Sequence, residues 1–285
     1  MTQAFGSRTL RQATVMALSL CVLAAAGCGL FQTGPDVPER YNSERPPRDL
    51  PNRSKKALIQ HVVENAKKFG TLTADCEAVI MSPLMSRRKR VRMSGELYLK
   101  KPGKIHLRLY GGGKLYVELQ GNGEAYRVNM PLFDNTRYSG KYGDPIRYQP
   151  GRLHFMPDDV VDCLSRANWF GGKIQVLRAL KKPAEWQIDN LKLQEGATPS
   201  LTIESSIQIN RRNQQVVEYT KFANDASVRL DAWFRNVQLV QTGERSVRIP
   251  SVIWLRYPME GTWIGLQLSG INLNVEIKPE HFVLN

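Results

Sequence analysis

The chain contains 285 residues, of which 42% are hydrophobic, so it can bury a proper core as one large domain or as two small ones. Beyond the N-terminal segment it has no run of about 18 consecutive apolar residues, which excludes a transmembrane helix in the body of the chain. Its formal net charge of +14 favours anionic surfaces, such as phospholipid headgroups, lipopolysaccharide phosphates or nucleic acid.

Residues 1–27 have the composition of a secretory signal. Two cations, Arg8 and Arg11, precede an apolar stretch from Ala13 to Ala26 that ends in small residues. A charged start, an apolar centre and a small-residue cleavage site are the three parts of such a signal. The apolar stretch, about fourteen residues long, is too short to span a bilayer comfortably as a permanent helix. We therefore predict that residues 1–27 are a signal peptide, and because the protein is then exported we expect no nucleic-acid partner.

A cysteine follows this segment directly. The run Leu23-Ala24-Ala25-Ala26-Gly27-Cys28 resembles the lipobox of bacterial lipoproteins, with Ala25 at the position where a leucine is commonest. The resemblance implies cleavage before Cys28 and covalent lipid such as palmitate on this cysteine, which anchors the protein in membrane lipid; we expect no other cofactor. Gly29 is not the aspartate that retains proteobacterial lipoproteins at the inner membrane, so the resemblance favours the outer membrane, facing the periplasm. The alternatives are a plain signal peptide with an incidental cysteine and an uncleaved N-terminal anchor.

We predict that residues 28–50 form the lipidated N-terminus and a flexible tether, and that residues 51–285 form the folded domain. The tether is proline-rich and contains few apolar residues: its prolines are Pro35, Pro38, Pro46 and Pro47. Such a segment cannot bury enough apolar surface to order itself. It would hold the domain clear of the lipid headgroups.

The first predicted element of the domain is an amphipathic helix from Lys55 to Phe69. Ser54 is a suitable N-cap, and Gly70 is a suitable stop. Apolar residues recur at a spacing of three to four, which places them on one helix face: they are Leu58, Val62, Ala66 and Phe69. This face must cover another apolar surface.

The pattern then changes to alternation of apolar and polar residues, which is typical of antiparallel strands with one covered face. The connectors Lys101-Pro102-Gly103, Gly111-Gly112-Gly113 and Gly121-Asn122-Gly123 all suit tight hairpins. We predict a meander of consecutive strands that runs to about Arg127.

The second half of the domain is predicted to be mainly strands. Residues 131–154 read as an irregular connection, and a short helix follows from Met156 to Leu164, with Pro157 and acidic residues in its first turn. Further strands are predicted at 185–193, 200–209, 215–222, 228–241, 248–257, 262–268 and 271–277. The fold class is therefore mainly β (α+β), with about eleven or twelve strands and two helices.

Parts of this pattern resemble periplasmic lipoprotein carriers of the LolA type and their anchored LolB-like relatives. The segment Ser94–Ile105, which contains the Lys-Pro-Gly turn, is similar to their strand–turn–strand opening. The segment Met156–Gly171 is similar to the short helix and aromatic segment of the LolB-like members, and Ile271–Phe282 is similar to their ending. The resemblance implies a strongly curved antiparallel sheet, an incomplete β-barrel of about eleven strands with a helical lid. It also implies that acyl chains or lipoproteins bind in an apolar cavity.

Two groups of residues are our candidates for binding lipid. Ligand sites are concave and mostly apolar, and the candidates for lining the cavity are Leu97, Leu99, Leu107, Leu109, Trp169, Phe170 and Trp254. Ordinary core packing is the alternative explanation for them. The candidates for contact with anionic headgroups are Arg87, Arg88, Lys89 and Arg90. A solvated hairpin tip is the alternative explanation for this basic run.

No constellation in the sequence supports catalysis, and we expect neither an enzyme nor a metal site. No nucleophile elbow or phosphate loop occurs. His154 lies close to several potential ligands, which are Asp158, Asp159, Asp162 and Cys163. Acidic residues in the first turn of a helix explain the aspartates without a metal. Cys76 and Cys163 either form a disulfide in an oxidising compartment or stay separate as buried thiols, which the sequence slightly favours.

Two functional hypotheses follow. The first is an envelope lipoprotein that binds a lipid or acyl chain in an apolar cavity, in lipoprotein or lipid trafficking to the outer membrane. The second is a non-catalytic structural or scaffold lipoprotein that uses its sheet as a protein-interaction surface. Permanent attachment at Cys28 favours a fixed acceptor or scaffold over a diffusing carrier.

Overall fold

The structure, a computed structural model, describes residues 54–81, 91–131, 136–142, 156–166, 169–170, 174–180, 185–194 and 200–284. These residues all belong to one compact unit of the chain, Arg45–Asn285. The predicted signal peptide and tether lie outside the described residues, and so does the basic run at 87–90. No helix within the described ranges is long and apolar enough to cross a membrane.

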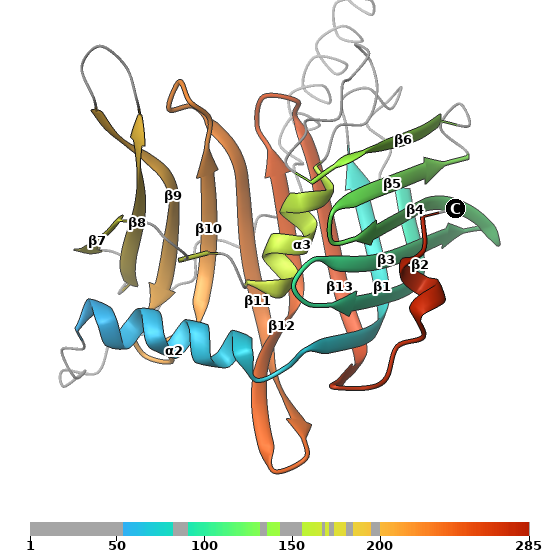
Figure 1. Ribbon diagram of the computed structural model, residues 1–285, viewed down its shortest axis with the longest axis horizontal. Helices are drawn as coiled ribbons and strands as arrows, with labels where there is room; N and C mark the ends of the chain where they lie inside the picture. Colours follow the sequence, from blue (N-terminus) through green and yellow to red (C-terminus); the bar gives the residue numbers. More distant parts are fainter. Residues whose placement is uncertain are drawn as a thin grey trace, which may run out of the picture. The chain divides into compact units, whose positions relative to one another are not determined.

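Thirteen strands in the described ranges form one antiparallel sheet, accompanied by two α-helices and a short 3₁₀-helix (Figure 1). The elements in chain order are α2 (Lys55–Lys67), β1 (Thr71–Met81), β2 (Val91–Lys100), β3 (Lys104–Gly111), β4 (Lys114–Asn122), β5 (Ala125–Met130), β6 (Thr136–Lys141), α3 (Pro157–Ser165), β7 (Ile174–Ala179), β8 (Glu185–Gln194), β9 (Ser200–Asn210), β10 (Val216–Phe222), β11 (Val228–Thr242), β12 (Arg245–Tyr257), β13 (Thr262–Leu273) and the 3₁₀-helix η2 (Pro279–Phe282).

The sheet consists of two meanders joined at its centre. Strands β1 to β6 form one meander and β7 to β13 form the other, and β1 pairs with β13. The two outermost strands, β6 at the end of the first meander and β7 at the start of the second, are the edges of the sheet and do not pair with each other. The sheet is therefore curved but unclosed, as the predicted incomplete barrel requires (Figure 1).

Alternation along the strands places the apolar residues on one face. Residues that lie opposite each other on neighbouring strands point to the same side of a sheet. Leu97 lies opposite Leu107, which lies opposite Leu119, and all three are buried. The same pattern continues through the second meander, where Phe234 lies opposite Ile253. One apolar face thus extends across both meanders.

Gly95 in β2 is required by the close approach of β3. A Cβ atom at this position would lie 1.7 Å from the backbone oxygen of Arg108. No other amino acid avoids this contact, so glycine at the start of the Ser94–Ile105 segment has a structural reason.

Helix α2 confirms the predicted first helix and covers one end of the second meander. Ser54 caps it, because its hydroxyl oxygen accepts a hydrogen bond of 3.3 Å from the backbone nitrogen of Ala57. Its predicted apolar face is buried. Asn65 holds the helix to β12 by two hydrogen bonds with the backbone of Arg248, of 2.9 and 3.2 Å. Figure 1 shows α2 running across the ends of β7 to β10.

Three strands and one boundary differ from the prediction. Strand β6 lies in the segment 131–154 that was predicted to be irregular, and strands β1 and β7 were not predicted. The final strand expected at 271–277 does not exist as a separate element, because β13 continues without a break to Leu273. Asn274 then adopts a left-handed backbone with φ of 56°, which ends the strand.

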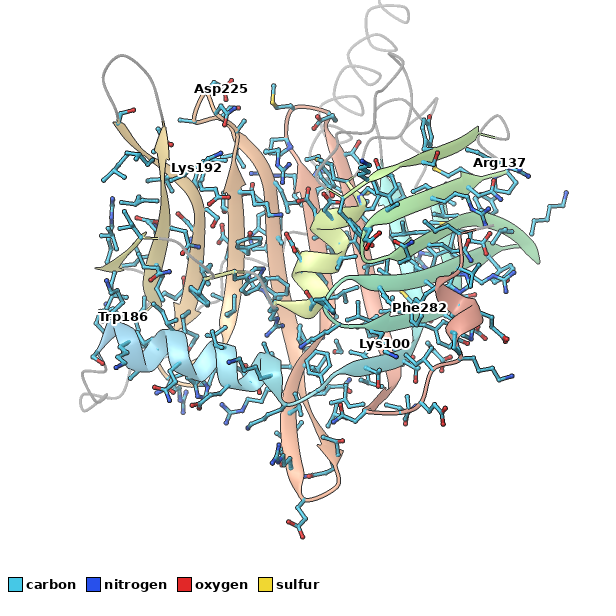
Figure 2. All side chains as sticks on the ribbon, viewed as in Figure 1. Lys100, Arg137, Trp186, Lys192, Asp225 and Phe282 are labelled. Carbon is cyan, nitrogen blue, oxygen red and sulfur yellow. The ribbon has the colours of Figure 1, made fainter. Side chains whose placement is uncertain are left out.

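The C-terminus docks on the outer side of the first meander through a pair of histidines. The Nδ1 atoms of His281 and His106 lie 3.1 Å apart, and Tyr98 stacks on the His281 ring with centroids 4.0 Å apart. Burial lowers the pKa of His106, although its hydrogen bond to Glu118 opposes this shift. A neutral His106 ring can share a single proton with His281. Phe282 is buried at this end of the chain (Figure 2).

Candidate functional site

The candidate site is the face of the sheet on which α3 lies, which we call the inner face. Tyr219, Phe234 and Tyr257 point to this side and contact the segment from α3 to Phe170. Register pairs connect this region to the first meander, because Phe234 lies opposite Ile253, Ile253 opposite Leu266, and Leu266 opposite Ala78. The inner face is therefore one continuous apolar surface.

The structure brings the four predicted leucines together on this inner face. Leu97 lies opposite Leu107 and Ala74, and Leu109 lies opposite Val117 on the next strand. Leu99 occupies the next inward position of β2, and all four leucines are at most 5% exposed. They form part of the same buried cluster as Trp169 and Phe170.

The aromatic residues after α3 cover the second meander. The Trp169 ring stacks on Tyr219 with centroids 4.6 Å apart and meets Phe234 at 5.7 Å. The side-chain nitrogen of Asn190 donates a hydrogen bond of 2.9 Å to the backbone oxygen of Trp169. Only 1% of Trp169 and 8% of Phe170 is exposed. The chain's own aromatic side chains therefore occupy the inner face here.

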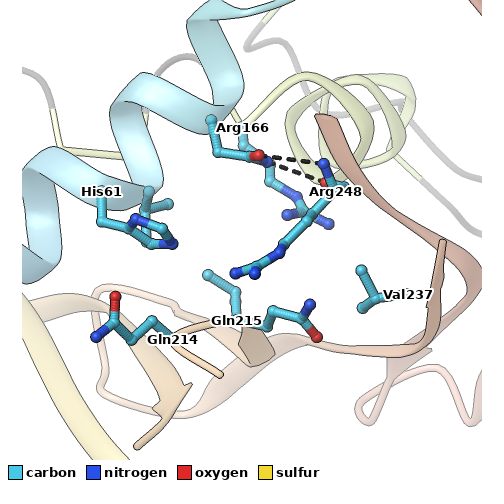
Figure 3. A pocket seen from close by; sticks show the side chains of 9 residues that line it. His61, Arg166, Gln214, Gln215, Val237 and Arg248 are labelled. Atoms are coloured by element: carbon cyan, nitrogen blue, oxygen red, sulfur yellow. Dashed lines mark hydrogen bonds between the residues drawn. The ribbon is translucent and has the colours of Figure 1, made fainter. Parts of the chain in front are cut away.

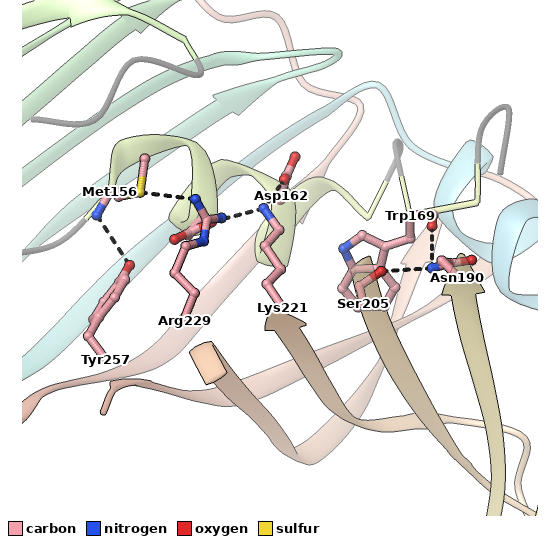
Figure 4. A network of polar contacts seen from close by, with 9 residues as sticks. Met156, Asp162, Trp169, Asn190, Ser205, Lys221, Arg229 and Tyr257 are labelled. Carbon is pink, nitrogen blue, oxygen red and sulfur yellow. Dashed lines mark hydrogen bonds and ion pairs between the residues drawn. The ribbon is translucent and has the colours of Figure 1, made fainter. Parts of the chain in front are cut away.

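Helix α3 is attached to the sheet by a cluster of polar contacts, which we call the α3 clamp (Figure 4). The fully buried Asp159 carboxylate lies 2.8 Å from Lys221 Nζ and 2.8 Å from an Arg229 nitrogen. Asp162 adds a second ion pair of 2.6 Å with Lys221. The backbone nitrogen of Met156 donates to the Tyr257 hydroxyl at 3.3 Å. Strands β10, β11 and β12 thus each supply one partner to the segment that begins α3.

The carboxylates of the α3 clamp keep its lysine charged. Burial by itself lowers the pKa of Lys221, but the carboxylates of Asp159 and Asp162 outweigh this effect and raise the pKa above its ordinary value. The second oxygen of Asp159 is buried without a hydrogen-bond partner among the described residues. Buried ion pairs of this kind orient an element, and they stabilise it little relative to apolar residues of the same size.

Trp254 does not join the predicted site. It lies opposite Trp233 and Gly265, on the face of the sheet away from α3. There it belongs to an outer aromatic group in which Trp233 and Trp263 stack with centroids 5.6 Å apart. Trp254 stands between Ile253 and Leu255, which both face inward, so alternation points its side chain outward. The prediction that Trp254 lines the inner site was therefore wrong.

The two remaining cysteines are separate buried thiols, as the sequence slightly favoured. Burial is the largest effect on both, and it raises the pKa of Cys76 to about 12 and that of Cys163 well above its ordinary value. Both thiols are therefore protonated at neutral pH and act as small apolar side chains.

Several predicted groups fall outside the part of the chain that the structure describes, and the potential metal ligands do not form a cluster within it. Cys28, the run Arg87, Arg88, Lys89 and Arg90, and His154 lie outside the described residues. Within the described ranges, no group of three or more His, Cys, Asp or Glu side chains has an arrangement that could hold a metal ion. The dipole of α3 was an incomplete explanation for Asp159, because this carboxylate is buried and paired with two cations of the sheet.

Sequence reasoning missed Lys221 and Arg229 as the partners of α3. Lys221 stands two residues after the inward-facing Tyr219, so the alternation places a cation on an otherwise apolar face. A charge at an inward position of a strand must find an opposite charge, and this was the available signal. The two aspartates of α3 are the matching acids.

Comparison with solved structures supports the fold. A crystal structure of a domain from Vibrio parahaemolyticus, described as an outer membrane lipoprotein-sorting protein, is similar with a TM-score of 0.54 at 8% identity, covering 79% of this chain and 94% of that one. A LolA superfamily protein from Nitrosomonas europaea has a TM-score of 0.52 at 11% identity, with coverages of 79% and 97%. A DUF1329 family protein from Desulfovibrio piger has a TM-score of 0.51 at 9% identity, with coverages of 80% and 96%.

These likenesses establish the fold class that the sequence predicted. The domain has a LolA-like fold, with a curved unclosed antiparallel sheet and helices on its inner side. No family model and no curated protein matches the sequence. Because the identities are so low, the likeness extends to the fold alone.

The α3 clamp predicts a specific stability effect. Replacing Asp159 by Asn leaves Arg229 and part of the Lys221 charge without a partner, so we expect the free energy of unfolding to fall by about 3 kcal/mol. Urea denaturation measures this change. As a control with the same change of charge, Glu244→Gln on the exposed β11–β12 hairpin should have no measurable effect. A loss below about 1 kcal/mol for Asp159→Asn would mean that the clamp does not hold α3.

Proposed function

We propose that this protein is a non-catalytic envelope protein that binds a lipid or acyl chain on the inner face of its sheet, beneath α3. The observation that carries the proposal is the construction of the site. A continuous apolar face is covered by a short helix that ion pairs, and not only apolar contacts, hold in place. When such pairs separate, each charge regains its hydration, which offsets part of the free energy lost when the cover is displaced.

The apolar face is suited to this ligand. An acyl chain gains about 0.8 kcal/mol for each CH₂ group that it buries. Leu97, Leu99, Leu107 and Leu109 form the surface of the first meander, and Trp169 and Phe170 occupy the surface of the second. In the proposal α3 shifts, and the acyl chain enters between α3 and the sheet and lies beside these two aromatic side chains. The name of the Vibrio parahaemolyticus neighbour, which refers to lipoprotein sorting, agrees with this reading.

We further propose that covalent lipid on Cys28 anchors the protein in a membrane. The favoured membrane is the outer membrane, with the protein facing the periplasm. The support is the N-terminal sequence, with its signal-like composition and its lipobox resemblance. More than one acyl chain makes such an anchor effectively permanent. A permanently attached protein acts as a fixed acceptor in lipid or lipoprotein trafficking, and not as a diffusing carrier.

A second candidate function is that of a scaffold that binds another protein with its sheet. The specific observation in its favour is a group of exposed apolar side chains at the β7 edge. Leu193 and Leu201 lie opposite each other on β8 and β9 and are 55% and 54% exposed, while Ile174 on β7 is 56% exposed. An open sheet edge with exposed apolar residues is a common site for a protein partner.

Brominated fatty acids distinguish the two candidates, because bromine quenches the fluorescence of a tryptophan that it touches. We expect a brominated acyl chain to quench the wild-type protein, because the chain lies beside Trp169. The quenching should be largely lost in Trp169→Phe and retained in the matched control Trp254→Phe, whose ring lies on the outer face. Absence of quenching in the wild type, or its loss only in Trp254→Phe, would contradict acyl binding on the inner face.

The anchor predicts where the protein is found after cell fractionation. The wild type should remain with the membranes after a high-salt wash, because salt screens charges but does not extract a lipid anchor. Cys28→Ser should appear in the soluble fraction, and mass spectrometry should show that it lacks the mass of the lipid. Membrane retention of Cys28→Ser through an uncleaved N-terminus would show that the anchor is not lipid on this residue.

A further inference from the structure

A cavity lies between α2 and the second meander, apart from the α3 clamp (Figure 3). The cavity opens to solvent, and its volume is about 20 Å³. It is lined by His61, Val62, Asn65, Arg166, Gln214, Gln215, Val216, Val237 and Arg248. The lining thus contains two arginines, a histidine and three amide side chains, and it contains no acidic residue.

Arg166 is the most unusual member of this lining. Its guanidinium is partly buried and lies over the rings of Phe234 and Trp169, at 5.0 and 5.7 Å from their centroids. Burial lowers the pKa of Arg166 to about 10. Among the described residues, its guanidinium has no carboxylate and no hydrogen-bond acceptor. Cations placed in an apolar environment normally have such a partner, because desolvation is costly.

A second cation nearby increases the positive potential. Lys101 lies 3.4 Å from the Phe69 ring centroid and donates to the backbone oxygen of Ala66 at the end of α2. Burial and the charge of Arg166 lower the pKa of Lys101 to about 7. A lowered pKa shows that the positive charge of Arg166 disfavours a second charge beneath the end of α2, where an anion would favour both cations.

Arg248 supplies the complementary donors. One nitrogen of its guanidinium donates to the backbone oxygen of Asn213 at 3.1 Å, which fixes the side chain and leaves further N–H groups. In Figure 3 its guanidinium extends into the cavity, above the side chain of Gln215 and opposite Arg166. Two guanidinium groups that face one space are well suited to the oxygens of a phosphate group.

The cavity and the inner face are connected through Arg166. This residue ends α3 in a left-handed backbone with φ of 53°, and its backbone nitrogen donates to Asp162, which belongs to the α3 clamp. Its guanidinium contacts the Trp169 ring that covers the inner face. A group bound in the cavity would therefore lie next to the end of an acyl chain beneath α3.

We propose that this cavity is an anion site that binds the phosphate group of an anionic amphiphile through Arg166 and Arg248. The proposal rests on the proposed function, because it assigns the headgroup of the lipid whose acyl chain lies on the inner face. The group that the cavity recognises is a phosphate, which either a lipid headgroup or free phosphate can supply. This assignment narrows the substrate class from lipids in general to phospholipids and related phosphorylated amphiphiles.

The test is native mass spectrometry of the full-length protein in detergent, with two lipids that carry identical acyl chains. Phosphatidylglycerol has an anionic phosphate, and diacylglycerol has none. We expect the wild type to bind phosphatidylglycerol at least about tenfold more tightly, the factor that one charge-assisted hydrogen bond provides. Arg166→Gln and Arg248→Gln should each lower the ratio of the two affinities by about tenfold. Arg245→Gln, an equal charge change on the exposed β11–β12 hairpin, should leave the ratio unchanged.

Inorganic phosphate identifies the source of the anion. If a lipid headgroup is the ligand, free phosphate should compete with phosphatidylglycerol and not with diacylglycerol. Binding of phosphate by a protein that binds neither lipid would support the anion site and contradict the proposed function. Equal binding of both lipids, insensitive to phosphate and to both arginine variants, would overturn the anion site while leaving acyl binding intact. Circular dichroism of each variant confirms that it is folded.

Discussion

The pairing of β1 with β13 is the constraint on which the rest of the structure depends. It joins the two meanders at their first and last strands, so that a single face of the sheet continues from β6 to β7. Neither meander alone would present so wide an apolar surface, and a surface of this size must be covered. The two helices supply the cover in different ways. Both helices bury apolar side chains, and α3 is held in addition by the charges of Asp159 and Asp162.

This difference between the helices has a functional consequence. Either helix exposes apolar side chains to water when it leaves the sheet, but opening the α3 clamp also exchanges ion pairs for hydration. Trp169, which covers Tyr219 and Phe234, follows closely after α3 in the chain. The unneutralised Arg166 stands at the end of the same helix. An anionic headgroup at Arg166 and an acyl chain beneath α3 would therefore act on one element, which connects the two proposals physically.

The sequence predicted the features that depend on local pattern. Alternation at Leu97 to Leu109 identified the strands and their buried face, and spacing from Leu58 to Phe69 identified α2. The sequence did not predict β7, because no local pattern marks the strand that pairs with β8. It did not predict β6 either, because the composition of that segment is typical of a loop. The clamp was missed because Asp159 and Lys221 are 62 residues apart and meet only when α3 crosses the sheet. Trp254 was placed wrongly because size does not indicate which face of a strand a residue occupies.

The central claim is that α3 moves from the inner face when an acyl chain binds there. Amide hydrogen exchange of the full-length protein, with and without a bound fatty acid, measures this movement most directly. The account predicts faster exchange at residues 157–165 in the complex, and unchanged exchange at η2, which docks on the outer side of the first meander. Unchanged exchange in α3, with new protection at the exposed apolar residues of β7 to β9, would contradict the claim and favour a protein-binding surface there.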